Sequence, residues 1–166
     1  MEDKNNDLYS GENNEKYVQH FFDQYKLYME GIEKISDRRE NANKYFVTIN
    51  SGLIVAVTFL LQHVDDFFFK PGMLVLLVTG AVFSVIFYFL INSYKQLNTG
   101  KFAVLHAMEK RLPVQMYTDE WIALGEGKDK RKYFPFSHIE RSIPIIFGVL
   151  YFSCLVLLII KFFVWK

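Results

Sequence analysis

Residues 72–91, GMLVLLVTGAVFSVIFYFLI, form a run of 20 residues without a charged side chain. A helix needs about 20 mostly apolar residues to cross the hydrocarbon core of a bilayer, which is roughly 30 Å thick. This stretch is therefore predicted to be a transmembrane helix, and the rest of the chain is interpreted outward from it.

Two further uncharged runs flank this stretch, at residues 45–62 and 143–160. Either run alone could be a buried helix of a soluble protein, but three such runs in 166 residues leave too little polar chain to cover them. In the last run, Pro144 is expected in the first helical turn, where proline is tolerated. The sequence predicts an all-α integral membrane protein with three transmembrane helices.

The basic residues are distributed unevenly between the segments that connect these runs. Nine of the 19 lie in residues 92–142 and four more lie between residues 34 and 44, whereas residues 63–71 hold two Asp and one Lys. Because Lys and Arg accumulate on the cytoplasmic side of membrane proteins, we expect a cytoplasmic N-terminus and a cytoplasmic 92–142 segment. Residues 63–71 then form an external hairpin, and residues 161–166 are an external C-terminus.

The polar segments are also expected to be largely helical. Residues 1–13 are rich in Asn, Asp and Glu, which predicts disorder. Residues 14–44 carry apolar side chains at spacings of three and four, which is typical of an amphipathic helix. This apolar stripe consists of Tyr17, Phe21, Tyr25, Tyr28, Ile32 and Ile35. It must be buried against segment 92–142, the lipid headgroups or a neighbouring subunit.

Segment 92–142 is predicted to form a small helical cytoplasmic cap. One helix should end at Pro113, and a second, short helix should begin with Thr118 as its N-cap and end at Gly125. About 50 residues cannot build a large core of their own, so the cap should depend on the helices beside it.

The first span carries a stripe of small or hydroxyl-bearing side chains at spacings of three and four, from which Asn50 is displaced. Its members are Thr48, Ser51, Val55, Thr58 and Gln62. In a homo-oligomer this face could line an uncharged aqueous pore. The alternative is close helix packing, for which Gly52/Ala56 and Gly80/Ser84 have suitable spacing. Both interpretations predict association, with contacts from Tyr17, Phe21, Tyr25, Tyr28, Gly52, Ala56, Gly80 and Ser84.

A basic and aromatic run, GKDKRKYFPF at residues 127–136, precedes the third span. The candidate residues are Lys128, Lys130, Arg131, Lys132, Tyr133, Phe136 and Arg141. The simpler interpretation is an interfacial collar that attracts anionic membrane lipids, at about 1 kcal/mol per charge. In a ring of subunits the same run would form a positive belt suited to a nucleotide or a single-stranded nucleic acid. Both interpretations stay open.

Signals of an enzyme, a metal site or a bound cofactor are weak. The histidines, His20, His63, His106 and His138, lack metal-ligand spacing, and Cys154 lies among Leu and Val with no base nearby. The spans carry no charged residue that could relay protons. We therefore expect neither catalysis nor a cofactor.

Three stretches, at 38–53, 92–113 and 119–144, resemble the RipA family of small bacterial membrane proteins. They are RRENANKYFVTINSGL, NSYKQLNTGKFAVLHAMEKRLP and DEWIALGEGKDKRKYFPFSHIERSIP. The resemblance implies a homo-octamer in the bacterial inner membrane and no catalytic residue.

Two functions follow from these patterns. The first is a gated pore or ion channel whose basic cytoplasmic face senses an anionic ligand, with an antiviral role suggested by analogy to small multi-span effectors. The second is a non-conducting scaffold, in which the stripe from Tyr17 to Ile35 docks a cytoplasmic protein partner.

Overall fold

The computed structural model describes residues 15–62, 69–128 and 131–164. Its elements are α1 (Glu15–Leu61), α2 (Phe69–Glu109), α3 (Met116–Ala123), the short 3₁₀ helix η2 (Gly125–Gly127) and α4 (Phe136–Val164). No strand occurs in these residues, which confirms the all-α prediction. The predicted disordered stretch 1–13, residues 63–68 of the predicted hairpin, Lys130 and the last two residues lie outside the described parts.

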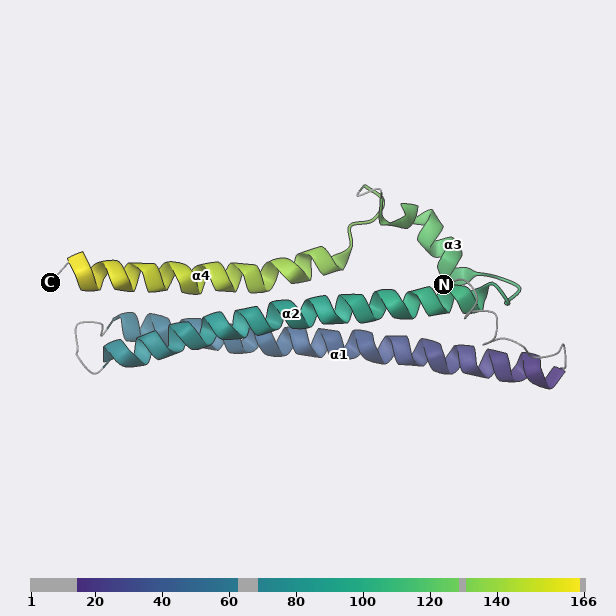
Figure 1. The fold of residues 1–166 in the computed structure, drawn as a ribbon, viewed down its shortest axis with the longest axis horizontal. Helices are drawn as coiled ribbons and strands as arrows, with labels where there is room; N and C mark the ends of the chain where they lie inside the picture. Colours follow the sequence, from purple (N-terminus) through teal and green to yellow (C-terminus); the bar gives the residue numbers. More distant parts are fainter. Residues whose placement is uncertain (1–14, 63–68, 129–130, 165–166) are drawn as a thin grey trace, which may run out of the picture.

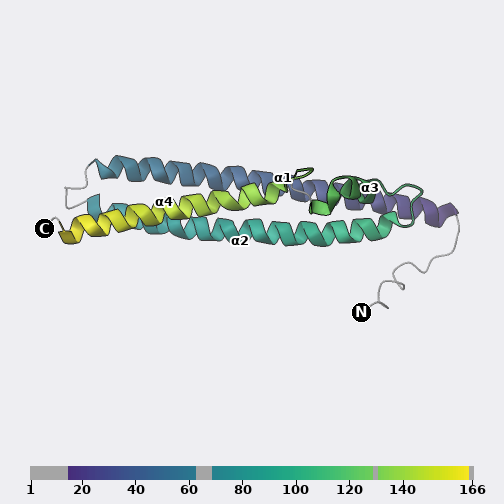
Figure 2. The ribbon, with the colours of Figure 1, turned by 90° about the horizontal axis from the view of Figure 1, so that it is seen from above.

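Helices α1 and α2 run antiparallel along most of the length of the molecule (Figure 1). Helix α4 lies beside them over one half only, and α3 lies near the other end (Figures 1 and 2). Three helices are long and apolar enough to cross a membrane, which confirms the three predicted spans. We call residues 45–62, 69–91 and 143–164 the spanning half, and residues 15–44 and 92–142 the polar half.

Three helices, α1, α2 and α4, extend without a break from one half into the other. Helix α1 joins the predicted amphipathic segment to the first span, and α2 continues past the second span to Glu109. The α2 helix ends four residues before Pro113, in a turn that Arg111 N and Leu112 N close onto the carbonyls of Met108 and Glu109. This agrees with the rule that the residue before a proline avoids the helical conformation.

The predicted position of Pro144 is wrong. Helix α4 already begins at Phe136, so Pro144 lies inside it rather than in its first turn. The cause is Pro135, because its carbonyl accepts a hydrogen bond from His138 N at 3.0 Å. The helix therefore begins several residues before the apolar run. Pro144 cannot donate to the carbonyl of Glu140, and the buried proline ring packs inside the bundle.

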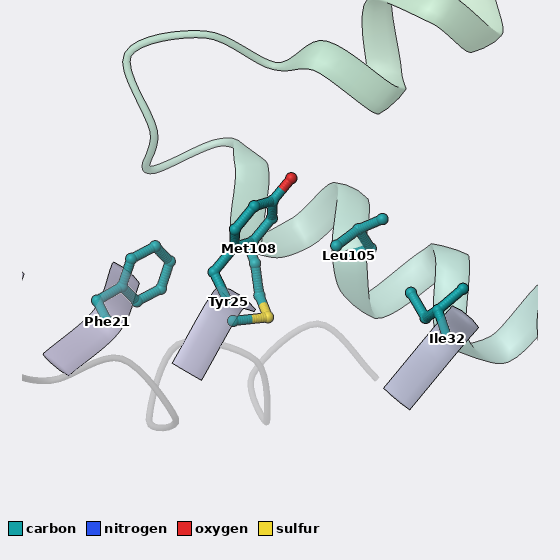
Figure 3. Close-up of a cluster of buried hydrophobic side chains, with 5 residues drawn as sticks. All are labelled: Phe21, Tyr25, Ile32, Leu105 and Met108. Carbon is teal, nitrogen blue, oxygen red and sulfur yellow. The ribbon is translucent and has the colours of Figure 1, made fainter. Parts of the chain in front are cut away.

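In the polar half, the aromatic stripe of α1 is buried by the chain's own α2. Phe21, Tyr25 and Ile32 of α1 pack against Leu105 and Met108 of α2 (Figure 3). Tyr25 is only 2% exposed. The predicted oligomer contacts at Phe21 and Tyr25 are therefore corrected: both side chains are used within one chain, because α2 continues far enough to cover the stripe.

In the spanning half, the three helices meet around Tyr151 of α4. A Cβ atom added to Gly80 would lie 2.3 Å from the Tyr151 ring, so only glycine lets the ring lie this close to α2. The Tyr151 hydroxyl donates to the Asn50 carbonyl at 3.0 Å, and the Ser84 hydroxyl donates to the Gly80 carbonyl at 2.9 Å. Gly80 and Ser84, predicted as oligomer contacts, instead pack α2 against α4 of the same chain.

Candidate ligand pocket in the polar half

A pocket of about 540 Å³ lies in the polar half, lined by residues from all four α-helices and from the segment before α4. Its size is that of a small-molecule site. The lining residues are Arg39, Lys95, Asn98, Thr99, Phe102, His106, Tyr117, Glu120, Trp121, Leu124, Tyr133, Pro135, Phe136 and His138.

Two cationic side chains line this pocket, Arg39 from α1 and Lys95 from α2. Arg39 Nε lies 3.4 Å from Glu140 Oε1, the oxygen that also accepts a hydrogen bond from Asn43 Nδ2 at 2.6 Å. A guanidinium carries five N–H donors, so this contact leaves the two terminal amino groups of Arg39 for another partner. Within the described parts of the chain, the ammonium of Lys95 forms no ion pair.

The aromatic side chains of the pocket come from α2, α3 and the segment before α4. The rings of Phe102 and Tyr117 lie edge to face with centroids 6.2 Å apart, and those of Trp121 and Tyr133 do so at 6.3 Å. Gly127, at a positive φ of 70°, brings the chain back against Trp121, where an added Cβ would lie 3.1 Å from the indole. The aromatic groups are thereby fixed by local packing.

Helix α3 is held in place by the buried carboxylate of Glu109, which lies in the last turn of α2. Glu109 Oε1 accepts from Tyr117 N at 2.8 Å, and Oε2 accepts from Thr118 N at 2.9 Å and from the Thr118 hydroxyl at 2.7 Å. The Tyr25 hydroxyl donates to Oε1 at 3.2 Å. A carboxylate at a helix N-terminus satisfies free N–H groups and complements the helix dipole.

This arrangement corrects the predicted cap of α3. The helix begins at Met116, and Thr118 lies within its first turn rather than at the N-cap. The carboxylate oxygens of Glu109, nine residues before Thr118, cap the helix, and the Thr118 hydroxyl donates to one of them.

Burial, together with the nearby Glu33, Glu120 and Glu109, raises the pKa of the Tyr117 hydroxyl. This pocket residue therefore presents a neutral phenol at neutral pH.

One side chain that lines the pocket has a buried polar atom without a partner. Asn98 Oδ1 accepts no hydrogen bond from any described residue. Near the start of the third span, Glu140 Oε2 likewise accepts no hydrogen bond from a described residue, and Arg141 Nε donates none. Buried acceptors and donors without partners are uncommon in folded proteins and often mark a place that water or a ligand occupies.

The predicted anion-binding residues are only partly brought together. Tyr133 and Phe136 line the pocket, while Lys128, Arg131 and Lys132 are exposed and lie outside its lining. Arg141 donates through a terminal amino group to Asn92 Oδ1 at 2.7 Å, which ties α4 to α2. The sequence-based interpretation missed Arg39 and Lys95, because it counted them only as charges near the membrane.

The predicted pore-lining stripe lies on the outer surface of the chain. Thr48, Ser51, Val55, Thr58 and Gln62 are all exposed, while Asn50 is completely buried. The Thr58 hydroxyl donates to the Ile54 carbonyl at 2.8 Å. A Cβ added to Gly52 would meet no atom within 4 Å, so the position faces open space in the single chain. Pore lining by this stripe stays a prediction.

The remaining predicted contact residues differ in their surroundings. Tyr17 and Tyr28 are half-buried between α1 and α2, with Arg111 donating to the Tyr17 hydroxyl at 3.2 Å and Lys101 lying over the Tyr28 ring. Ala56 is half-buried in the spanning half. No group of three or more His, Cys, Asp or Glu side chains that could hold a metal ion occurs in residues 15–62, 69–128 and 131–164.

The fold defines a helical membrane protein with three spans and a polar helical extension on one side. A family model then places it more closely: residues 22–162 match the octameric membrane protein family (8xMP), and the chain belongs to this family. It is therefore an oligomeric membrane protein, as the sequence predicted. No curated protein and no solved structure matches the chain.

Proposed function

We propose that the oligomer forms a gated pore for ions in the bacterial inner membrane, with the uncharged stripe of α1 lining the conduit. The observation that carries this proposal is the exposure of the whole stripe, from Thr48 to Gln62, on an oligomeric membrane protein. Lipid offers no hydrogen-bond partner for hydroxyl and amide groups, whereas water or a neighbouring subunit does.

The opposing argument is that the stripe only packs subunits together. The Thr58 hydroxyl already has a partner in the Ile54 carbonyl, so it does not need water. Ser51 and Gln62 are exposed as well, and the amide of Gln62 is too polar to face lipid at low cost. A pore accounts for these side chains together.

We further propose that the polar half faces the cytoplasm and that an anionic ligand bound there controls the pore. The ligand class is a nucleotide or a single-stranded nucleic acid, and the biological role is that of a non-enzymatic antiviral effector. Support comes from the nine basic residues of segment 92–142 and from the two cations in the pocket.

Single-channel recording of the purified oligomer in planar bilayers tests the pore. We expect discrete current steps from the wild type and none from Ser51→Leu or Thr58→Leu, because leucine would fill and dry the conduit. Val82→Leu, at an exposed apolar position of α2, is the matched control and should conduct normally. Size-exclusion chromatography verifies that each variant remains assembled. Normal currents from both stripe variants would remove α1 from the pore.

A non-conducting scaffold is the second candidate, but it needs a different face of α1. Tyr25 is buried against α2, so the aromatic stripe cannot dock a partner without unfolding. Val18, Phe22 and Leu27 are 61%, 41% and 66% exposed and offer another apolar surface in the polar half. The scaffold predicts that Leu27→Asp loses a specific protein partner while wild-type bilayers stay electrically silent.

A further inference from the structure

The pocket combines three features that favour one chemical class of ligand. It contains two cations, it is surrounded by aromatic rings, and it exposes few groups that would repel an anion. The aromatic rings are those of Phe102, Tyr117, Trp121, Tyr133 and Phe136. Cations bind phosphate oxygens, and aromatic rings stack on flat heterocycles.

The acidic residue Glu120 limits how much negative charge the pocket can accept. Among the Lys, Arg, Asp and Glu side chains of the lining, Arg39, Lys95 and Glu120 leave one net positive charge, and Glu140 beside Arg39 offsets part of it from outside the lining. A single phosphate group suits this balance better than a polyphosphate does. Glu120 is also a suitable acceptor for an amino group on the ring of the ligand.

We propose that this pocket binds one nucleotide unit with an amino-bearing base, either as a free nucleoside monophosphate or as the terminal nucleotide of a short strand. The phosphate binds Lys95 and the terminal amino groups of Arg39, and the base stacks on Trp121. This inference rests on the ligand-sensing part of the proposed function. It differs from the sequence-based interpretation, because the exposed residues Lys128, Arg131 and Lys132 take no direct part.

Arg39 connects the phosphate-binding part of the pocket to the helices that form the spans. The guanidinium touches the pocket and, through Nε, the buried carboxylate of Glu140 on α4. It lies on α1 nine residues before Thr48, where the exposed stripe begins. A phosphate that binds the guanidinium therefore changes the contact between Arg39 of α1 and Glu140 of α4. Both helices continue into the spanning half.

Isothermal titration of the purified full-length oligomer in detergent tests the pocket without reference to conductance. The probes are adenosine monophosphate, adenosine, inorganic phosphate and the dinucleotide ApA. We expect adenosine monophosphate to bind, and adenosine and phosphate to bind at least about tenfold more weakly, because each lacks half of the contacts. Tighter binding of ApA than of the monophosphate would identify a strand end as the source of the nucleotide.

Four variants locate the bound probe. Lys95→Gln and Trp121→Leu should each weaken binding of adenosine monophosphate by about tenfold, and Trp121→Phe should restore most of the affinity, because it keeps an aromatic ring for stacking. Lys132→Gln, an exposed basic position outside the lining, is the matched control and should bind as the wild type does. Hydrogen exchange of α3 verifies that the fold is retained.

Three results would overturn the inference. They are no binding of adenosine monophosphate to the wild type, equal binding of inorganic phosphate and the nucleotide, or a loss of affinity in Lys132→Gln with none in Lys95→Gln. The last result would favour the exposed basic run. Because titration detects binding in a silent protein, failure of the pore and failure of the pocket are distinguishable.

Discussion

Each half of the molecule joins three helices, but the two halves do so with different chemical groups. In the polar half, a carboxylate with four donors, Glu109, joins α1, α2 and α3. In the spanning half, α1, α2 and α4 meet through neutral groups: the Tyr151 hydroxyl of α4 donates to the Asn50 carbonyl of α1, and the Ser84 hydroxyl of α2 donates to Asn50 Oδ1 at 3.4 Å. A buried charge needs several donors to offset its desolvation, and these are available where a helix begins beside it.

The first prediction tests the charged contact and has the largest expected effect. Glu109→Leu leaves Tyr117 N, Thr118 N and the Thr118 hydroxyl without an acceptor, and hydrogen bonds to a charged group contribute about 1.5–3 kcal/mol each. We expect α3 to detach while α1 and α2 stay paired. Hydrogen exchange of residues 116–123 should rise at least about a hundredfold, with little change in residues 45–61.

Glu109→Gln is the informative companion to this variant. It keeps the size of the side chain and one acceptor oxygen, but it places an NH₂ group where a backbone N–H and a hydroxyl donate. We expect an intermediate effect on the exchange of α3. Unchanged exchange in both variants would show that packing of Trp121 and Tyr117, rather than the carboxylate, holds α3.

The second prediction tests the neutral contact. Gly80→Ala places a methyl group where the Tyr151 ring lies, so the ring must move and give up its bond to the Asn50 carbonyl. Overpacking of this kind costs about 1–3 kcal/mol. The measurement is the thermal unfolding midpoint of the oligomer in detergent, which should fall. Tyr151→Phe, which removes only the hydroxyl, should lower it less.

Part of this comparison could be predicted from the sequence. Apolar runs and basic loops identify the three spans, because hydrophobicity and charge are local properties of a segment. The segment against which a residue packs depends on the whole fold and not on the residues beside it in the sequence. The spacing of Gly80 and Ser84 predicts close packing, but it does not distinguish α4 of the same chain from a second subunit.

Glu109 did leave a signal in the sequence. An acid in the last turn of a helix opposes the helix dipole, which favours cations there. Such a residue suggests that a second helix begins beside it, and Met116 begins α3 seven residues later. The pocket left no comparable signal, because Arg39, Lys95, Trp121 and Phe136 come from segments that only the fold brings together.

The third prediction concerns the boundary between the halves. Glu140 is 3% exposed and lies against Arg39 and Asn43 of α1. Glu140→Gln keeps the shape of the side chain but removes the charge that Arg39 Nε faces, so we expect a loss of about 1–2 kcal/mol. A smaller fall of the unfolding midpoint than in Glu109→Leu is the expected result, together with altered affinity for adenosine monophosphate through the released Arg39.

A fall of the midpoint in Glu140→Gln as large as that in Glu109→Leu would contradict this ranking. It would mean that the α1–α4 contact, rather than the attachment of α3, limits the stability of the polar half.

The last prediction is that an exposed ion pair of the same kind has no measurable effect. Lys44 and Glu40 form a close i,i+4 pair on α1, with both side chains more than 60% exposed. Water screens such a pair and already solvates both charges, so its loss changes little. Glu40→Gln should leave the unfolding midpoint where it is in the wild type. Since Glu40 and Glu140 both face a cation from α1, a difference between the two variants measures burial rather than charge. A midpoint that falls equally in both would show that the loss of one negative charge facing a cation of α1, and not the burial of the contact with α4, determines the effect.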